Sequence, residues 1–395
     1  MRICIIVDDY LPSSIKVAAK MMHELAIKLK EKGHEITVIT PGIGLNQGYK
    51  KTSLNEVTIL QFASGEIKNV SKVRRLINEW MLSKKAWRYL KEYFIQNHHD
   101  LIVYYSPSIF WGNLVFRLKT LWQAPSYLIL RDFFPQWIID NGMIREKSLI
   151  AYFFKYYERL NYKAADRIGI QSPSNIEWFS ETFPEFKNIQ LLYNWATDSP
   201  VLNQGDFYRK KLNLVGKVVF FYGGNIGQAQ DMMNIVRLAA RMKSNTDAAF
   251  LLVGAGDEVE LVRRSIRDLK LSNMILLNSV PQEEFKIMLA EFDIGLFTLH
   301  FNHKTHNFPG KILGYMVQEK PILGAVNIGN DLKNILEESG SGLVTIAGDD
   351  DGFYKNALVL LDEKIRKQMG KNANLLLKSK FSIDNASDTI LKILS

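Results

Sequence analysis

Short apolar runs alternate with helical patterns along the chain, and this alternation limits the possible folds more than any other feature. The runs typical of strands are Ile3–Val7, Glu35–Thr40, Val57–Gln61, Leu101–Tyr105, Ser126–Leu130, Arg167–Gln171, Val218–Tyr222, Ala249–Val253, Met274–Leu277, Ile294–Thr298, Ile322–Gly324 and Gly342–Thr345. Several are rich in Val and Ile without regular alternation, which is typical of strands buried on both faces of a parallel sheet. Helical patterns such as Ala18–Lys32, ended by Gly33, lie between them and predict doubly wound α/β units.

The chain is long enough for two such domains. Its 395 residues exceed the ~250–300 that one hydrophobic core usually supports. Asp198-Ser199-Pro200 is a turn signal, and a new strand begins at Val218 as if the fold started again. We predict an N-terminal Rossmann-like domain over 1–198, a C-terminal one over 199–379, and a last helix, 380–395, that can pack on the first. Ligands are expected at the carboxyl ends of the strands, with the domains facing across a cleft.

Charge and cysteine content indicate the kind of partner and the compartment. The formal net charge is +9, and a basic surface suits nucleotides, nucleic acid or anionic lipid. No nucleic-acid recognition motif is present, so we expect no nucleic-acid partner. The single cysteine, Cys4, cannot form an internal disulfide. The first apolar run is too short for a signal sequence, and no run reaches the ~18–20 residues of a transmembrane helix, so we expect a cytoplasmic protein.

A glycine-rich segment, Phe220–Asp231, follows one of the predicted strands. Gly223, Gly224 and Gly227 let the backbone approach a ligand closely, and N–H groups at the start of the next helix attract phosphate. The segment is therefore a candidate diphosphate cradle, and the alternative is an ordinary tight turn. It is neither a G-x-G-x-x-G motif nor a Walker loop. Gly254 ends the next strand in the same way, and there too the alternative is a simple turn.

Lys311 has an unusual place in its predicted helix. It lies at or near the first turn, just after Pro309, a residue pre-shaped for helix starts. A cation there opposes the helix dipole and costs stability unless an anion lies nearby. A bound phosphate would supply that anion, and the alternative is a solvated lysine.

Two segments carry a resemblance to a known family. They are Gly224-Asn225-Ile226-Gly227-x-Ala229-Gln230 and Phe308-Pro309-x-Lys311-Ile312-Leu313-x-Tyr315-Met316. The chain resembles retaining family-4 glycosyltransferases of the GT-B fold over nearly its whole length. The opening Val7–Lys20 and Arg131–Pro135 make it most similar to WbuB-type enzymes of bacterial O-antigen synthesis, which are N-acetyl-L-fucosamine transferases.

The resemblance implies a UDP-sugar donor held mainly by the C-terminal domain. Gly224, Asn225 and Gly227 would cradle the diphosphate, Lys311 would neutralise it, and Ile312 and Leu313 would lie beside the nucleotide. The implied acceptor is a sugar on undecaprenyl diphosphate, at the cytoplasmic face of the inner membrane. Retention in this family is thought to require no protein nucleophile. No metal-ligand spacing stands out in the sequence, so we expect neither metal nor cofactor.

The chain departs from the family at two positions. Many family members carry a pair of Glu residues that bind the donor sugar and the ribose, and His306 and Gly314 occupy those positions here. His306 is therefore the candidate for the sugar contact. The basic residue that the family usually carries in the first loop of the C-terminal domain is also absent, and Asn225 stands near its position. These gaps leave open an alternative, a non-catalytic nucleotide-sugar-binding subunit.

Carboxylates follow two strands of the N-terminal domain. Asp132 comes after Ser126–Leu130, where it can orient an acceptor hydroxyl or act as a base, and the alternative is a local pair with Arg131. Asp8 and Asp9 end the first strand, where they line the same site or cap the next helix.

The segment Lys68–Phe94 is basic and contains Trp and Leu residues at helical spacing. This composition indicates a helix at a membrane surface, and the alternative is a solvated helix with an ordinary core face.

Overall fold

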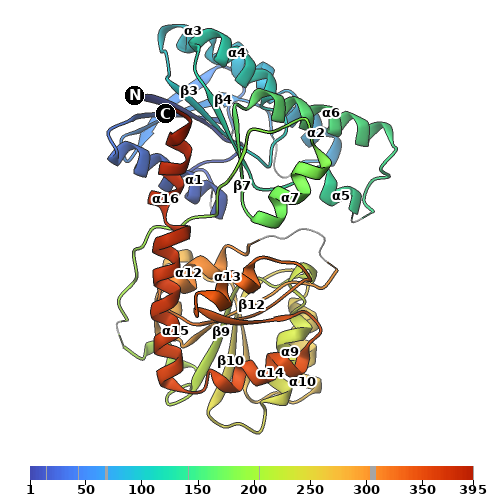
Figure 1. Ribbon diagram of the computed structural model, residues 1–395, viewed down its shortest axis with the longest axis vertical. Helices are drawn as coiled ribbons and strands as arrows, with labels where there is room; N and C mark the ends of the chain where they lie inside the picture. The colour runs from blue at the N-terminus through green and yellow to red at the C-terminus, as the bar shows by residue number, and fades with distance from the viewer. Residues whose placement is uncertain are drawn as a thin grey trace. The chain divides into compact units, whose positions relative to one another are not determined.

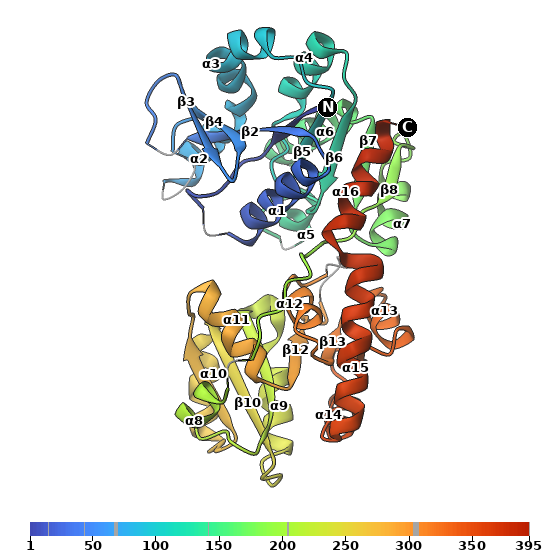
Figure 2. The ribbon, with the colours of Figure 1, turned by 90° about the vertical axis from the view of Figure 1, so that its left-hand side faces the viewer.

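The computed structural model describes residues 1–14, 16–42, 44–66, 70–140, 142–203, 205–302 and 308–394, apart from the side chain of Lys72. The chain divides into two compact units, drawn in Figures 1 and 2. Unit 1 consists of Met1–Tyr193 with Ile383–Ser395, and unit 2 of Asn194–Ser382.

Unit 1 is built on a sheet of eight strands among its described residues. They are β1 (Arg2–Ile6), β2 (Glu35–Gly42), β3 (Tyr49–Leu54), β4 (Val57–Ala63), β5 (Leu101–Tyr105), β6 (Ser126–Leu130), β7 (Arg167–Ile170) and β8 (Ile189–Leu191). Their order is β3-β4-β2-β1-β5-β6-β7-β8, and every pair is parallel except β3 with β4. The order therefore reverses between β1 and β5, as it does in Rossmann folds.

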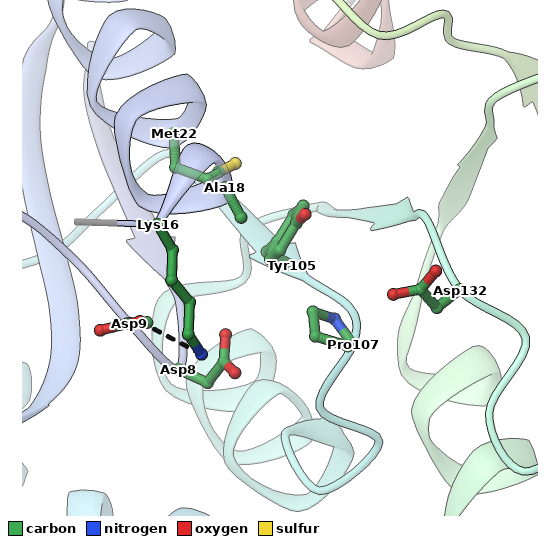
Figure 3. A pocket seen from close by; sticks show the side chains of 8 residues that line it. All are labelled: Asp8, Asp9, Lys16, Ala18, Met22, Tyr105, Pro107 and Asp132. Atoms are coloured by element: carbon green, nitrogen blue, oxygen red, sulfur yellow. Dashed lines mark ion pairs between the residues drawn. The ribbon is translucent and has the colours of Figure 1, made fainter. Parts of the chain in front are cut away.

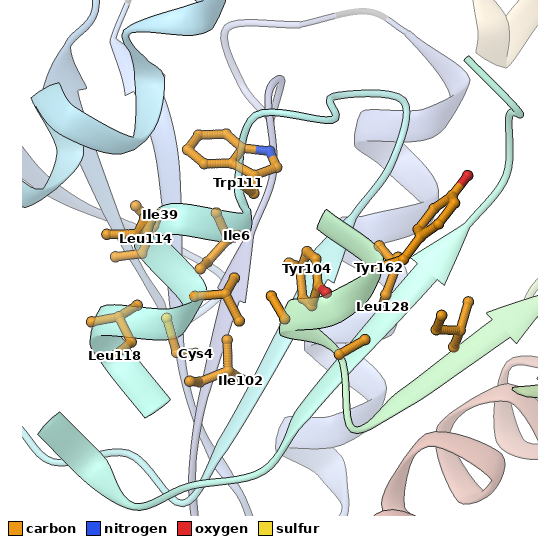
Figure 4. Packing of buried hydrophobic residues seen from close by; sticks show 14 of the residues in the cluster. Cys4, Ile6, Ile39, Ile102, Tyr104, Trp111, Leu114, Leu118, Leu128 and Tyr162 are labelled. Carbon is orange, nitrogen blue, oxygen red and sulfur yellow. The ribbon is translucent and has the colours of Figure 1, made fainter. Parts of the chain in front are cut away.

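Helices accompany this sheet through unit 1. They are α1 (Val17–Glu31), α2 (Lys72–Trp80), α3 (Leu82–Gln96), α4 (Gly112–Trp122), α5 (Gln136–Asp140), α6 (Leu149–Ala164), α7 (Pro173–Thr182) and α16 (Ile383–Leu391), followed by a 3₁₀ turn (Lys392–Leu394). Cys4 and Ile6 of β1 belong to the core cluster that includes α3 and α4 (Figure 4). Ile3 and Ile5 point to the opposite face and are also fully buried. Burial on both faces explains why the strand lacks polar alternation, and it makes Cys4 a core residue.

The last helix belongs to unit 1. α16 packs on α1, and Lys28 pairs with Asp384 at 3.2 Å while Lys32 pairs with Asp388. These ion pairs are largely exposed and contribute little, so apolar contacts hold the helix. Ile390, for example, is fully buried.

Unit 2 contains a six-stranded parallel sheet among its described residues. The strands are β9 (Val218–Asn225), β10 (Ala248–Ala255), β11 (Met274–Asn278), β12 (Ile294–Thr298), β13 (Ile322–Val326) and β14 (Gly342–Ile346), in the order β11-β10-β9-β12-β13-β14. The helices are α8 (Phe207–Lys211), α9 (Met232–Arg241), α10 (Val259–Asp268), α11 (Gln282–Glu291), α12 (Lys311–Val317), α13 (Leu332–Glu338), α14 (Asp350–Val359) and α15 (Glu363–Leu376), with a 3₁₀ turn (Gln228–Gln230) and a π-helical turn (Leu377–Phe381). The order reverses between β9 and β12.

The structure divides the chain after Tyr193 and after Ser382, whereas the sequence analysis places the divisions after 198 and 379. The segment from Asn194 is bound to unit 2. Ala196 bridges to Ser382, and Asp198 accepts a hydrogen bond from Asn374 at 2.9 Å. The turn signal at Asp198 therefore lies within unit 2, shortly after the division between the units.

Every predicted strand is present, and the doubly wound parallel fold is confirmed for both units. The sequence analysis missed two strands, β3 and β8. Both lie at the ends of the sheet order, where a strand is covered less fully. β3 is mostly exposed and β8 has three half-buried residues, so neither forms an apolar run.

The predicted membrane helix over 68–94 needs correction. The described part of this segment forms two helices, α2 and α3, that meet at Met81. In α3, Leu82, Leu90 and Phe94 are fully buried in the core of unit 1. α3 is therefore a core helix, and Lys68 lies outside the described residues. Within the part of the chain that the structure describes, no helix has the length and apolar character needed to cross a bilayer.

Candidate functional site

In each unit the order of the strands reverses, and the candidate residues follow strands at that reversal or, for Asp132, the next strand in the sheet. Crevices form at such points, at the carboxyl ends of parallel strands. In unit 1 these residues are Asp8, after β1, and Asp132, after β6. In unit 2 they are Gly224, at the end of β9, and Lys311, which follows β12.

The ammonium group of Lys311 is buried and has no hydrogen-bond partner among the residues the structure describes. It lies 3.5 Å from the centroid of the Tyr222 ring, whose face attracts cations. Burial lowers the pKa of Lys311 to about 7. The residue as a whole is half-buried, but its nitrogen is covered. The ammonium group is therefore not solvated, which argues against the alternative of a solvated lysine.

Gly224 borders this ammonium group. Its φ of +121° favours glycine, and a Cβ atom there would lie 3.7 Å from Cε and 3.8 Å from Nζ of Lys311. Gly254 pairs with Gly224 between β9 and β10, and a Cβ on Gly254 would lie 1.9 Å from the carbonyl oxygen of Gly224. Gly254 thus allows the close approach of the two strand ends, and its contribution to the site is through Gly224.

The remaining glycines of the cradle differ in what they do. A Cβ on Gly223 would lie 2.0 Å from the Phe285 ring, so Gly223 makes room for packing. A Cβ on Gly227 would lie 2.6 Å from Oδ1 of Asp257 and 2.8 Å from Nδ2 of Asn225. Gly227 therefore lies among polar groups. Asn225 is exposed, and its amide donates to Gln230 at 2.7 Å.

The strand extends further into the glycine-rich segment than the predicted Val218–Tyr222. β9 runs to Asn225, and the next α-helix begins at Met232. The ladder with β10 continues through Gly223 and Gly224, which explains the length of the strand.

Ile312 and Leu313 hold the Lys311 helix in place. Both side chains are buried, and their N–H groups donate to the carbonyls of Pro309 at 3.2 Å and Gly310 at 3.3 Å. Gly314 lies inside α12, where a Cβ would meet only Leu289, at 3.5 Å. His306 lies outside the described residues.

Tyr222 is a site residue that the sequence analysis missed. It lies two residues before Gly224 and therefore on the same face of β9, which is the face that Lys311 covers. Its hydroxyl donates to the Asn225 carbonyl at 2.5 Å. The alternation of side chains along a strand was the available signal, but only the structure shows that Lys311 lies over the Tyr222 ring.

Unit 1 contains a pocket at the ends of β1 and β5, shown in Figure 3. Among its lining residues are Asp8, Asp9, Lys16, Tyr105 and Asp132. Lys16 pairs with Asp9 at 3.5 Å, so Asp9 serves a local pair at the start of α1. The structure brings Asp8 and Asp132 to one pocket, which the sequence analysis treats as a possibility only.

The two other carboxylates of this pocket have raised pKa values. Burial raises the pKa of Asp8 to about 6, although the positive charge of Lys16 opposes the rise. Burial also raises the pKa of Asp132, and the charge of Arg131 opposes it. Asp132 is nevertheless open to solvent on one side. Arg131 is buried and donates to the carbonyls of Leu192, at 2.9 Å, and Tyr193, at 3.2 Å.

Asp8→Asn is expected to stabilise the protein at pH 8. The folded state binds the Asp8 proton more tightly than the unfolded state, so wild-type stability falls as pH rises from about 4 to about 6 and stays lower above that. The amide removes this cost, and we expect a gain of about 1–2 kcal/mol in the free energy of unfolding. Urea denaturation at pH 4.5 and pH 8 measures it. If the substitution changed the free energy of unfolding equally at both pH values, the charge of Asp8 would not be what destabilises the protein.

Among the described residues, no group of three or more His, Cys, Asp or Glu side chains could hold a metal ion.

Comparisons with known proteins agree on one class of protein. Residues 204–375 match the family described as Glycosyl transferases group 1. The chain is 25% identical over 218 residues to a probable glycosyltransferase, WbjE, of Pseudomonas aeruginosa, with 54% of each chain covered. It thus matches only about half the length of this relative. It is 22% identical over 360 residues to N-acetyl-alpha-D-glucosaminyl L-malate synthase of Bacillus anthracis, covering 89% of this chain and 86% of that one.

A solved structure supports the architecture. The crystal structure of Anabaena Alr3699/HepE in complex with UDP and glucose matches with a TM-score of 0.71 at 14% identity. The match covers 100% of this chain and 99% of the other. A likeness at this identity shows the fold, and it confirms the pair of Rossmann-like domains that the strand pattern predicts.

Proposed function

We infer that this chain is a glycosyltransferase of the GT-B fold, with a group 1 domain in residues 204–375. We propose that it transfers a sugar from a UDP-sugar to a sugar carried on undecaprenyl diphosphate, with retention at the transferred carbon. The proposed sugar is N-acetyl-L-fucosamine or another N-acetylated amino sugar. The proposed setting is O-antigen or surface polysaccharide synthesis, with the enzyme bound peripherally to the cytoplasmic face of the inner membrane.

One observation carries the donor half of this proposal: the buried, unpartnered ammonium group of Lys311 beside Gly224. A buried cation without an anion is costly, and a protein retains one where a ligand supplies the counter-charge. The diphosphate of a UDP-sugar has that charge and fits a cradle of glycines. HepE was solved with UDP, which supports the choice of nucleotide.

Lys311 also explains how the reaction would be accelerated. As the bond between the sugar carbon and the diphosphate oxygen breaks, negative charge grows on the departing diphosphate. A cation already fixed at that place stabilises the transition state without reorganisation, and such groups contribute ~10²–10³ in rate. The raised pKa values of Asp8 and Asp132 support the pocket of unit 1 as the acceptor site. There Asp132 would orient the acceptor hydroxyl or accept its proton.

The kind of sugar is supported less directly. The resemblance to WbuB-type enzymes favours N-acetyl-L-fucosamine, and the B. anthracis relative is named for an N-acetyl-glucosaminyl product. Neither His306 nor Gly314 supplies the carboxylate that many family-4 enzymes use. This departure favours a second candidate, a subunit that binds the nucleotide sugar without turning it over.

The experiment measures UDP release from a panel of UDP-sugars, with and without an undecaprenyl-diphosphate-linked sugar. We expect one N-acetylated donor to be turned over only when the lipid-linked acceptor is present. Protection of the protein against thermal unfolding by UDP provides the binding control. Protection without turnover for every donor and acceptor would favour the binding subunit.

Binding of UDP is expected to take up a proton at pH 8. Free Lys311 is then mostly neutral because its pKa is about 7, and a bound diphosphate raises that pKa again. The affinity for UDP should therefore fall by up to about tenfold per pH unit above pH 7. Calorimetry in two buffers of different ionisation enthalpy measures the proton. Identical binding enthalpies in both buffers would contradict the contact with Lys311.

A further inference from the structure

Helix α2 exposes a row of apolar side chains. Val73, Ile77 and Trp80 are spaced by four and three residues, so they share one face of the helix. All three are exposed, Val73 to 69%. Leu76 belongs to the same apolar stripe, beside Trp80, and packs against the buried cluster of Ile109, Phe110, Ile138 and Phe154. One edge of the apolar stripe is therefore anchored through Leu76, and the rest of the stripe is exposed to solvent.

Helix α6 does the same with larger side chains. Leu149, Tyr152 and Tyr156 are spaced by three and four residues and are exposed to 89%, 59% and 63%. The opposite face carries Phe154, which is buried in the cluster. An amphipathic helix normally buries its apolar face, but here a second apolar row remains uncovered.

The two rows belong to one surface. The Trp80 indole donates to the Tyr157 hydroxyl at 2.6 Å, and the rings of Trp80 and Phe153 lie 6.2 Å apart. These contacts join α2 to α6, and Figure 1 shows the two helices next to each other. We call the set Val73, Ile77, Trp80, Leu149, Tyr152 and Tyr156 the α2–α6 face.

Basic residues outnumber acidic ones in the two segments that carry this face. Residues 70–80 and 140–160 together contain seven Lys or Arg and four Asp or Glu. One of the acids, Glu158, is buried, and burial raises its pKa to about 8. Arg145 and Lys147, just before α6, are exposed and make no ion pair with any described residue. Four of the other cations are paired, Arg74 with Glu66, Arg75 with Glu79, Lys155 with Glu146 and Arg159 with Glu185. Among the described side chains, the uncompensated positive charge beside the face therefore comes from Arg145 and Lys147.

We propose that unit 1 docks on an anionic lipid surface through the α2–α6 face. Protruding apolar and aromatic side chains enter the boundary between headgroups and acyl chains, while flanking Lys and Arg contact anionic headgroups. Tyr and Trp suit this boundary because each has an apolar body and a polar tip. A second copy of the chain fits less well, since a two-fold contact would bring the same cations face to face.

This surface shares α2 with the segment that the sequence analysis favours, but α6 takes the place of α3. The apolar residues of α3 lie in the core, and the exposed apolar rows come from α2 and from α6, some 70 residues later. The inference extends the proposed function, which places the acceptor in a membrane. Binding to vesicles needs neither donor nor acceptor, so the two can fail separately.

The test is co-sedimentation with vesicles of phosphatidylglycerol and phosphatidylcholine, compared with vesicles of phosphatidylcholine alone. We expect the full chain to sediment with the anionic vesicles and weakly with the neutral ones. The double variant Ile77→Glu/Leu149→Glu should lose at least tenfold in vesicle affinity. Arg145→Ala and Lys147→Ala should each lose about fivefold at low salt. Ile328→Glu, at a residue 80% exposed in unit 2, is the matched control and should bind like wild type.

Three further measurements interpret the outcome. Thermal unfolding checks that the double variant folds, which is expected because both side chains are exposed. UDP release with a short-chain, water-soluble acceptor should persist in that variant, which separates docking from turnover. Sedimentation velocity reports self-association. The proposal would be overturned if the double variant bound vesicles as well as wild type does. It would also be overturned if neither protein bound vesicles while wild type formed a dimer and the double variant stayed monomeric.

Discussion

Lys311→Met is expected to give a protein that is more stable than wild type and turns over its donor at least ~10²-fold more slowly. Methionine fills about the same space beside Tyr222 and Gly224 without a group that needs a partner. Removing an unsatisfied buried polar group should raise the free energy of unfolding by about 1–3 kcal/mol. The opposite signs of the two effects separate a ligand-binding role from a structural one. Thermal unfolding and UDP release are the measurements.

The pH dependence sharpens this expectation. The unfolded chain holds the Lys311 proton up to about pH 10.5, whereas the folded chain releases it near pH 7. Unfolding between these values takes up a proton, so wild-type stability should rise with pH over this window, by up to about 1.4 kcal/mol per unit. Lys311→Met should lack this rise. A variant that keeps the wild-type slope would contradict the burial of the charge.

Lys320 offers a matched control. It is another half-buried lysine of unit 2, and burial lowers its pKa, but its ammonium donates to the Ala290 carbonyl at 2.9 Å. Lys320→Met breaks a satisfied hydrogen bond and should therefore destabilise the protein. If both variants were destabilised alike, Lys311 would be a structural residue and the donor site would lie elsewhere.

Gly254→Ala is expected to damage both stability and turnover. The new Cβ would lie 1.9 Å from the Gly224 carbonyl oxygen, and a backbone atom cannot move aside as a flexible side chain does. The ends of β9 and β10 must separate, at a cost of about 1–3 kcal/mol in the free energy of unfolding. The shift displaces Gly224 from Lys311, so turnover should fall by at least ~10-fold, more than the loss of folded protein explains.

Gly314→Ala is the control for this substitution. The added Cβ would meet only Leu289, at 3.5 Å, inside α12. Alanine favours helix over glycine, so the variant should be as stable as wild type or up to about 1 kcal/mol more stable. Normal turnover in Gly254→Ala, measured on protein shown to be folded, would mean that the strand ends do not position the donor.

The two units differ in how much of their site can be predicted from sequence. In unit 2, the glycines and Lys311 lie in segments whose residue types point to a bound anion. What could not be predicted is the burial of Lys311, because it depends on Tyr222, some 90 residues earlier. In unit 1, Asp8 and Asp132 are each visible at a strand end, but their common pocket depends on the order β1-β5-β6. The α2 half of the α2–α6 face lies in the segment Lys68–Phe94, which the sequence already indicates as a membrane-surface candidate. The α6 half could not be predicted, since Leu149 has the character of a core residue in the sequence.

The sequence by itself determined the parallel sheets, the division into two Rossmann-like domains, and the edge of each sheet where we expect ligands to bind. It could do so because a strand buried on both faces needs apolar side chains at consecutive positions, and such a run is visible in the sequence. Tertiary structure alone decided which side chains are without partners and which apolar rows remain uncovered. Those properties depend on what distant segments bring close, and Lys311 over Tyr222 and Trp80 against α6 are contacts of that kind.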